Sequence, residues 1–289
     1  FPVQNTSYRE MGIIICTLGL QRMRISIRFS PGQVTQEMKL QQEDSTLFQG
    51  LTAIYLNKST SLALSMKTLY FCSMNVNKDL SLKVAELLLK TKAVRLQPDK
   101  PFTWASGWKS PIYCDNRITL SFPEVRTHIR QGYAQTILDN FGKPDVIAGV
   151  ATGGIAQGAL IAQELGLPFI YVRSAAKGHG MENLIEGAYQ EGQRVVVIED
   201  LISTGGSSLK AVEALRAGGL DVKGLIATFT YGFALAEKHF SAANCPHVCL
   251  TDYSTLIDVA AKTNYVSETD EATLRAWRNS PSTWMQDNH

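Results

Sequence analysis

The chain has 289 residues, of which 45% are hydrophobic and 19% charged, with a formal net charge of +2. This composition is that of an ordinary globular protein and excludes a low-complexity or disordered polypeptide. The near-neutral balance argues against nucleic acid as a partner, and no apolar run approaches the roughly 20 residues of a membrane span. The five scattered cysteines, an odd number, favour reduced thiols. We therefore expect a cytoplasmic protein that binds neither nucleic acid nor a membrane.

The first 73 residues show no sustained helix or strand pattern, although short apolar runs such as residues 11–20 occur. They hold seven of the 28 Lys and Arg but only four of the 26 Asp and Glu. We expect Met74 to be the natural start, and residues 1–73 to be upstream sequence or a poorly ordered extension. A chain expressed from Met74 should then stay soluble and active.

An orderly pattern begins after residue 73. Apolar residues at helical spacing predict an amphipathic helix over residues 79–92. Aromatic and β-branched residues on either side of turn pairs predict a hairpin-like unit over residues 102–117. Ser121 and Glu124 have the spacing of a capping box, with a proline between them, and predict a helix that runs to about Phe141.

Strands and helices alternate in the rest of the chain. Strands are predicted at residues 145–150, 169–172, 195–200, 224–230 and 247–250. Helices are predicted at residues 155–165, after Ser207 as far as Gly218, and at 234–239, 254–262 and 268–279. This alternation favours an α/β fold with a parallel sheet and right-handed crossovers.

Residues 195–207 form the most informative stretch. An unbroken run of β-branched aliphatic residues predicts a strand that is buried on both faces and ends at Glu199 and Asp200. The loop Ser203–Ser207 then opens a helix, and such a loop offers N–H groups and a helix dipole to a phosphate. Two carboxylates would repel a bare phosphate but accept hydrogen bonds from hydroxyls. The stretch therefore predicts a site for a phosphorylated ribose, with a solvated turn as the alternative.

A second stretch, residues 173–187, lacks regular pattern inside the alternating region. Loops of this length are usually functional or disordered. Arg173, Lys177 and His179 lie within seven residues, which suits a polyanion such as pyrophosphate; a solvated loop with incidental basic residues is the alternative. The turn Thr152–Gly154 follows a neighbouring strand and would supply further backbone donors.

Together these residues resemble the type I phosphoribosyltransferases, whose phosphoribosyl-pyrophosphate motif is similar to residues 195–207. A wider set resembles the orotate phosphoribosyltransferases within that family and covers nearly all of residues 74–289. This set comprises Phe102, Thr103, Ser106, Gly107, Lys109–Tyr113, Arg117, Arg173, Lys177, His179, Gly180 and residues 199–207.

The resemblance implies a type I phosphoribosyltransferase fold over residues 74–289, with a central, mostly parallel sheet flanked by helices and a small hood at about residues 95–120. It implies transfer of the 5-phosphoribosyl group from phosphoribosyl pyrophosphate to orotate, in pyrimidine biosynthesis. Phosphoribosyl pyrophosphate would arrive with Mg²⁺, for which no direct protein ligand is expected. The enzyme would be a homodimer whose catalytic loop reaches into the partner's site.

The resemblance also implies a role for each site residue. Glu199 and Asp200 would hold the ribose diol, and Lys177 and Asp200 would be catalytic. Arg173, Lys177 and His179 would bind the substrate from the catalytic loop. Ser203 would also lie near the orotate, whose carboxylate Arg117 or backbone donors near residues 109–113 would bind. The 5-phosphate would be wrapped by Leu201, Ile202, Ser203, Thr204, Gly205, Gly206 and Ser207.

The chain departs from the family pattern at two places, and the first of them bears on the pyrimidine. Some members have an arginine where this chain reads Thr230–Phe233, and some have a second loop lysine where it has Ser174. Two alternatives stay open: a phosphoribosyltransferase that acts on a purine base, against which residues 102–117 and the basic loop argue, and a non-catalytic regulator that senses phosphoribosyl pyrophosphate. A comparison of orotate with hypoxanthine as substrate discriminates between the two enzymes.

Overall fold

The structure is a computed structural model that describes residues 12–19, 22–28, 36–40, 74, 76–104, 107–175 and 184–285. The chain divides into two compact units, Phe1–Cys72 and Ser73–His289. Each unit is described by itself.

The first unit contains a three-stranded antiparallel sheet in the order β1-β2-β3. Its strands are β1 (Gly12–Gly19), β2 (Arg22–Arg28) and β3 (Gln36–Leu40). These strands were not predicted, although Met23, Ile25 and Ile27 alternate with polar residues in β2, as strand residues do. That residues 1–73 are an extension or upstream sequence stays a prediction.

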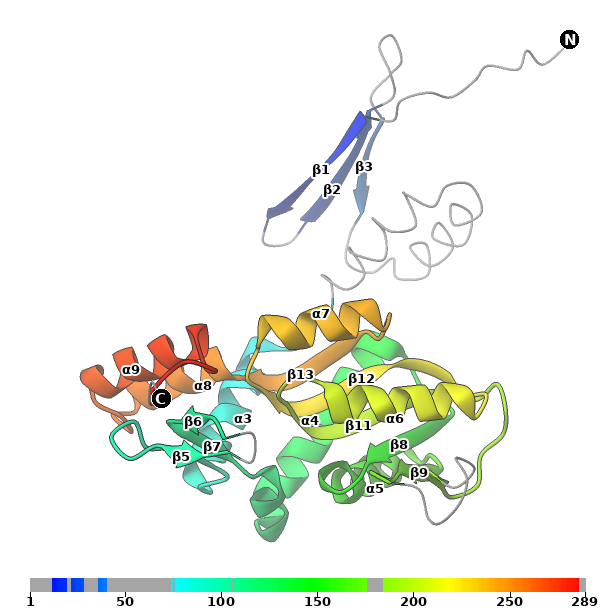
Figure 1. Cartoon of the computed structure of the whole chain (residues 1–289). Helices are drawn as coiled ribbons and strands as arrows, with labels where there is room; N and C mark the ends of the chain where they lie inside the picture. Colours follow the sequence, from blue (N-terminus) through cyan, green and yellow to red (C-terminus); the bar gives the residue numbers. More distant parts are fainter. Residues whose placement is uncertain are drawn as a thin grey trace, which may run out of the picture. The chain divides into compact units, whose positions relative to one another are not determined.

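The second unit is built on a six-stranded sheet in the order β10-β9-β8-β11-β12-β13 (Figure 1). The five strands from β9 to β13 along this order run parallel, and β10 pairs with β9 antiparallel. The expected mostly parallel sheet is thereby confirmed. The strands are β8 (Val146–Val150), β9 (Phe169–Val172), β10 (Ile185–Glu186), β11 (Arg194–Ile202), β12 (Asp221–Thr230) and β13 (His247–Asp252).

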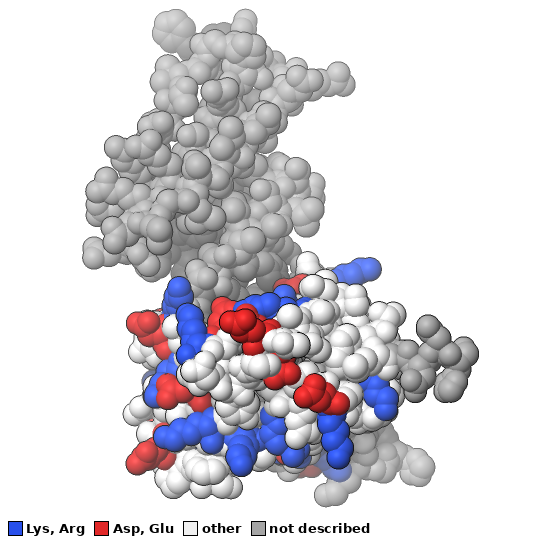
Figure 2. Space-filling model, turned by 90° about the vertical axis from the view of Figure 1, so that its left-hand side faces the viewer, with Lys and Arg blue, Asp and Glu red and all other residues white. Residues whose placement is uncertain are grey.

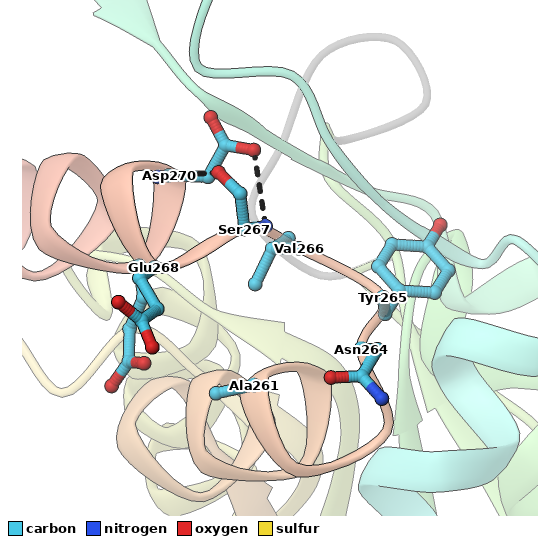
Figure 3. Close-up of a pocket in the computed structure, with 8 residues that line it drawn as sticks. Ala261, Asn264, Tyr265, Val266, Ser267, Glu268 and Asp270 are labelled. Carbon is cyan, nitrogen blue, oxygen red and sulfur yellow. Dashed lines mark hydrogen bonds between the residues drawn. The ribbon is translucent and has the colours of Figure 1, made fainter.

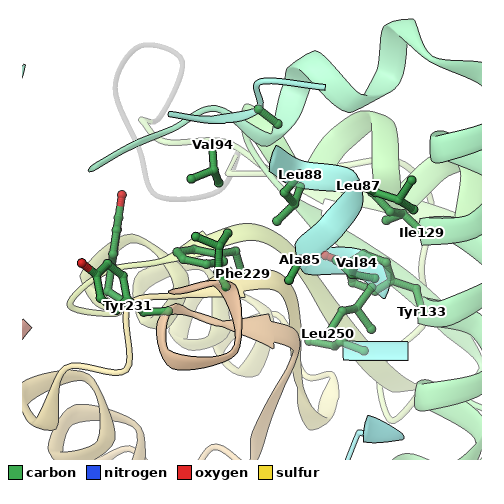
Figure 4. Close-up of a cluster of buried hydrophobic side chains, with 14 of the residues drawn as sticks. Val84, Ala85, Leu87, Leu88, Val94, Ile129, Tyr133, Phe229, Tyr231 and Leu250 are labelled. Carbon is green, nitrogen blue, oxygen red and sulfur yellow. The ribbon is translucent and has the colours of Figure 1, made fainter. Parts of the chain in front are cut away.

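Helices cover both faces of this sheet because its strands are apolar on both sides. Val196 and Ile198 of β11 belong to one buried cluster, and Val195 and Val197 belong to the other, as the alternation of a strand requires. Figure 4 shows part of the first cluster around Phe229 and Leu250. Its helices are α3 (Lys78–Lys90), α4 (Pro123–Phe141), α5 (Gly153–Leu165), α8 (Tyr253–Lys262) and α9 (Glu268–Asn279); those of the second cluster are α6 (Gly206–Ala217) and α7 (Ala234–Ala242).

The predicted hood consists of two small antiparallel pairs and a 3₁₀ helix. The pair β5–β6 is the predicted hairpin, whereas the pairing of β4 with β7 was not predicted. The elements are β4 (Val94–Leu96), β5 (Phe102–Thr103), β6 (Lys109–Ser110), β7 (Ile112–Cys114) and η1 (Asn116–Ser121).

The structure corrects three predicted boundaries. The capping box at Ser121 is wrong, because Ser121 ends η1 and α4 begins at Pro123 without a side-chain cap. Strand β11 continues two residues beyond the acid pair, since β12 offers it a partner as far as Thr230. The predicted loop also ends early, because Ile185 and Glu186 return to pair with β9.

The surface drawn in Figure 2 mixes Lys and Arg with Asp and Glu, and no single-sign field covers this face of the described residues. Among the helices of the described part of the chain, none combines the length and the apolar character that crossing a membrane takes.

Candidate active site

The candidate site begins where β11 extends beyond the end of its neighbour β8. The register with β8 ends at Ile198 opposite Gly149, while the register with β12 continues to Ile202 opposite Thr230. The last four residues of β11 therefore have a strand partner on one side only. Glu199 and Asp200 lie in this overhang, at the carboxyl edge of the sheet.

Strand alternation sends the two carboxylates to opposite faces. Glu199 lies on the α6 side, where its Oε2 accepts a hydrogen bond from the Ser208 hydroxyl at 3.0 Å and its Oε1 accepts from the Asp200 N–H at 3.0 Å. Asp200 lies on the α5 side, where a β-carbon at Gly153 would overlap its carboxyl group. Any larger residue at position 153 would require the Asp200 carboxyl group to move.

The environment of Glu199 favours the protonated form of its carboxyl group. The residue is 4% exposed. Burial raises the pKa of Glu199 to about 8, helped by the negative charge of Asp200 and opposed by the hydrogen bonds from the Asp200 N–H and Ser208. At neutral pH the Glu199 carboxyl group is therefore mostly protonated.

Two side chains from outside β11 donate hydrogen bonds to the backbone carbonyl groups of Glu199 and Asp200. The buried Asn116 donates from Nδ2 to the Asp200 carbonyl at 2.6 Å, and Tyr133 donates its hydroxyl to the Glu199 carbonyl at 2.7 Å. A carbonyl oxygen only accepts, so the Thr228 hydroxyl, 2.8 Å from the Tyr133 oxygen, donates to Tyr133. The sequence analysis missed these residues. A tyrosine on the apolar face of a helix was the available signal, because a buried Tyr hydroxyl needs a partner.

The predicted phosphate loop leads directly into α6. Gly205 is the N-cap residue, with a left-handed φ of +81°, and the first helical bond runs from the Leu209 N–H to the Gly205 carbonyl. The N–H groups of Gly206, Ser207 and Ser208 therefore point out of the helix start, as those of an anion site do.

The second glycine turn lies beside the first, as predicted. Thr152 is the N-cap residue of α5, the Ala151–Thr152 peptide is cis, and β8 and β11 are neighbours in the sheet. A β-carbon at Gly154 would overlap the Ile198 carbonyl. Two helix N-termini thus open at adjacent strand ends, on either side of the acid pair.

The predicted basic residues are placed only in part. Arg173 follows β9, and its Nη1 lies 3.4 Å from Glu186 Oε1. Arg117 pairs in two places with Asp115, at 2.7 and 2.9 Å, and its side chain is half exposed. Lys177, His179, Gly180 and Ser106 lie outside the described residues. The roles predicted for these side chains stay predictions.

A cavity of about 600 Å³ lies apart from these residues, where α8 meets α9 (Figure 3). It shares none of the predicted site residues, and its lining carries the carboxyl groups of Glu268, Asp270 and Glu271. Asp270 and Ser267 form the capping box of α9. These carboxylates would repel a phosphate, so the cavity does not compete with the acid strand as a phosphate site.

Comparisons with known proteins agree with this geometry. A family model described as "Phosphoribosyl transferase domain" matches residues 122–249, a range that includes the acid strand and both glycine turns. Together with the parallel sheet and the loop at α6, this match defines a phosphoribosyltransferase.

Comparison with individual proteins shows to which family of phosphoribosyltransferases the chain belongs. The chain is 58% identical over 207 residues to an orotate phosphoribosyltransferase of Bacteroides fragilis, and the match covers 72% of this chain and 98% of that protein. The structure is similar to that of an orotate phosphoribosyltransferase from Aeropyrum pernix (TM-score 0.57, 28% identity, 64% of this chain and 99% of that one). It is also similar to a UMP synthase of Leishmania donovani (TM-score 0.60, 30% identity, 69% of this chain and 42% of that one). The chain belongs to the orotate phosphoribosyltransferase family.

Proposed function

We propose that this chain transfers the 5-phosphoribosyl group from phosphoribosyl pyrophosphate to orotate, giving orotidine 5′-phosphate and pyrophosphate in cytoplasmic pyrimidine biosynthesis. The observation that carries the proposal is the overhang of β11, where the carboxyl group of Asp200 lies between two helix N-termini. A sugar that bears a phosphate at one end and a diphosphate at the other needs two anion sites separated by hydroxyl acceptors. The 58% identity to a relative named for orotate supports the choice of base.

The substrate is positioned by groups on both sides of the overhang. The N–H groups at the start of α6 and the Ser203 and Thr204 hydroxyls hold the 5-phosphate. Asp200 accepts hydrogen bonds from the two ribose hydroxyl groups. Its neighbour Glu199 is the second carboxyl group of the pair that holds this diol. The protonated state of Glu199 lowers the repulsion between this pair and the substrate's phosphates.

Magnesium fits this arrangement as a partner of the substrate. No group of three or more metal-ligating side chains occurs among the residues that the structure describes. Mg²⁺ commonly keeps several waters and binds through one or two carboxylates and substrate phosphates. The substrate would carry the ion into the site, and no direct protein ligand is expected. When bound, it would supply positive charge to the diphosphate.

The reaction needs electrostatic stabilisation more than a nucleophilic side chain. Departure of pyrophosphate from C1 builds positive charge on the ribose ring and negative charge on the leaving oxygens. The Asp200 carboxylate stabilises the ring beside it. Lys177, Arg173 and His179 neutralise the leaving group, and the orotate nitrogen gives up its proton and bonds to the cationic carbon. Arg117 and Ser203 lie near the orotate.

The catalytic loop acts between subunits in this proposal. The segment that carries Lys177 supplies this residue to the site of the partner protomer, as the family resemblance implies. The enzyme is therefore a homodimer, and each of its two sites takes residues from both chains.

An absorbance assay of orotate consumption tests the proposal, with phosphoribosyl pyrophosphate and Mg²⁺ present. We expect turnover with orotate and none with hypoxanthine. Turnover with hypoxanthine alone would assign the chain to purine bases. Binding of phosphoribosyl pyrophosphate without turnover of either base would indicate a regulator.

A further inference from the structure

Helix α7 touches the phosphate loop although neither the motif nor the proposed chemistry involves it. His239 lies in the last turn of α7, and its Nδ1 is 2.9 Å from the Thr204 carbonyl oxygen. The next residue, Phe240, is fully buried, and its ring lies 2.7 Å from the position that a Gly205 β-carbon would take. Two consecutive residues of α7 therefore hold two consecutive residues of the loop.

The chemistry of this contact fixes its direction. The Thr204 carbonyl can only accept, so Nδ1 of His239 carries the hydrogen and donates it. The peptide between Thr204 and Gly205 is trans. In a planar trans peptide the C=O and N–H groups point in opposite directions. The bond that draws the Thr204 oxygen toward α7 consequently aims the Gly205 N–H away from α7.

We propose that His239 is a positioning residue of the phosphate loop, which sets the orientation of the Thr204–Gly205 peptide before substrate arrives. The inference rests on the proposed function, in which this loop holds the 5-phosphate. His239 does not touch the substrate in this role. It saves the loop from reorganising when phosphate binds, so its loss weakens binding of the phosphate end and leaves the chemical step unchanged.

Three substitutions separate this role from general damage to the helix. In His239→Asn the amide nitrogen falls near the place of Nδ1 and can still donate to Thr204. In His239→Gln the amide falls near the place of Nε2, and His239→Leu has no donor. We expect His239→Leu and His239→Gln to raise KM for phosphoribosyl pyrophosphate between about threefold and tenfold, the loss of one neutral hydrogen bond. We expect His239→Asn to stay within about twofold of wild type.

The other kinetic constants show whether the effect is confined to KM for phosphoribosyl pyrophosphate. In all three variants kcat and KM for orotate should stay within about twofold of wild type, because the bond acts before the chemical step. Lys238→Gln is the matched control, since it removes a positive charge from the same helix at an exposed position. Its KM for phosphoribosyl pyrophosphate should equal that of wild type. Thermal unfolding of each variant verifies that the fold is intact.

Calorimetric binding of ribose 5-phosphate supplies a readout that does not need turnover. The dissociation constant should rise in His239→Leu and His239→Gln and return in His239→Asn. If the wild type binds ribose 5-phosphate but does not consume orotate, the proposed function fails while the His239 inference is still tested. Unchanged binding and KM in His239→Leu, or an Asn variant as weak as the Leu variant, would overturn the inference.

Discussion

Glu199 shows how one buried carboxyl group links the site to stability. Its pKa is about 4.5 in an unfolded chain and about 8 in the folded protein. Between these values the folded state holds a proton that the unfolded state has lost. The free energy of unfolding should therefore fall as pH rises from about 4.5 to about 8, and it should be level above that range.

Glu199→Gln should remove this fall, because a glutamine does not ionise and still offers an oxygen to the Asp200 N–H. We expect the variant to exceed wild type by about 1–3 kcal/mol near pH 7.5 and to match it near pH 4.5. Urea unfolding across this pH range measures both curves. Glu213→Gln, at an exposed position of α6, is the control and should leave the wild-type curve in place. Parallel curves for Glu199→Gln and wild type would show that Glu199 ionises normally in the folded protein.

Gly153 is a second residue whose identity follows from a neighbour. The three atoms nearest to an added β-carbon at this position all belong to the Asp200 side chain. Gly153→Ala should therefore destabilise the wild type by about 1–3 kcal/mol through overpacking. The same change in an Asp200→Ala background should be neutral or slightly stabilising, because alanine favours the helix start. Thermal unfolding of the four proteins measures the coupling, and equal effects in both backgrounds would mean that Gly153 is required by something other than Asp200.

Regular elements were predictable where a local pattern was decisive. The unbroken apolar run at residues 195–198, the alternation of strands with helices and the Gly–Gly turns predicted a parallel sheet with two anion sites at one edge, and the structure confirms that sheet. The short strand pairings were not predicted. β4 pairs with β7 and β10 pairs with β9 through long-range contacts, and a pattern of two or three residues does not specify such partners. Asn116 was missed for the same reason, since its partner Asp200 lies 84 positions away.

Helix α9 fastens the hood to the sheet. The buried Trp277 donates from Nε1 to the Lys109 carbonyl at 3.2 Å and packs edge-on against Trp104, with ring centroids 5.7 Å apart. The next residue, Arg278, donates to the carbonyls of Tyr231 and Gly232 at 3.3 Å. One turn of α9 thus links the hood with the loop that follows β12.

Truncation of this indole should be costly. We expect Trp277→Ala to lower the free energy of unfolding by about 3–5 kcal/mol, as for other large aromatic residues removed from a core. Trp277→Phe keeps most of the packing and loses the donor, so about 1 kcal/mol is expected from the hydrogen bond. Denaturant titration measures both. A Phe variant as unstable as the Ala variant would assign the stabilisation to the hydrogen bond and not to the ring.

At the scale of the whole molecule, the proposal that the Lys177 loop is shared between protomers predicts that two inactive chains together form one active site. Lys177→Ala alone should lower kcat by ~10²–10³-fold, the effect of losing one preorganised charge, and Asp200→Ala should also be inactive. Co-expressed in equal amounts, half of the dimers would be mixed, and each would hold one site with both residues intact. About a quarter of wild-type activity is then expected from a closed two-fold dimer.

The control is to mix the two purified variants without subunit exchange, which should yield no recovery. Recovery on co-expression would require a loop that crosses between protomers. If co-expression yields no activity although mixed dimers are isolated by two affinity tags, the loop serves its own subunit.

The contact between Trp277 and Lys109 spans 168 positions of the chain. During synthesis the hood leaves the ribosome long before the helix that covers its aromatic rings. Closing so long a loop is entropically costly and slow compared with local folding. The nascent protein therefore completes the packing of the hood only once α9 has been released, and Trp104 stays without its Trp277 partner until then.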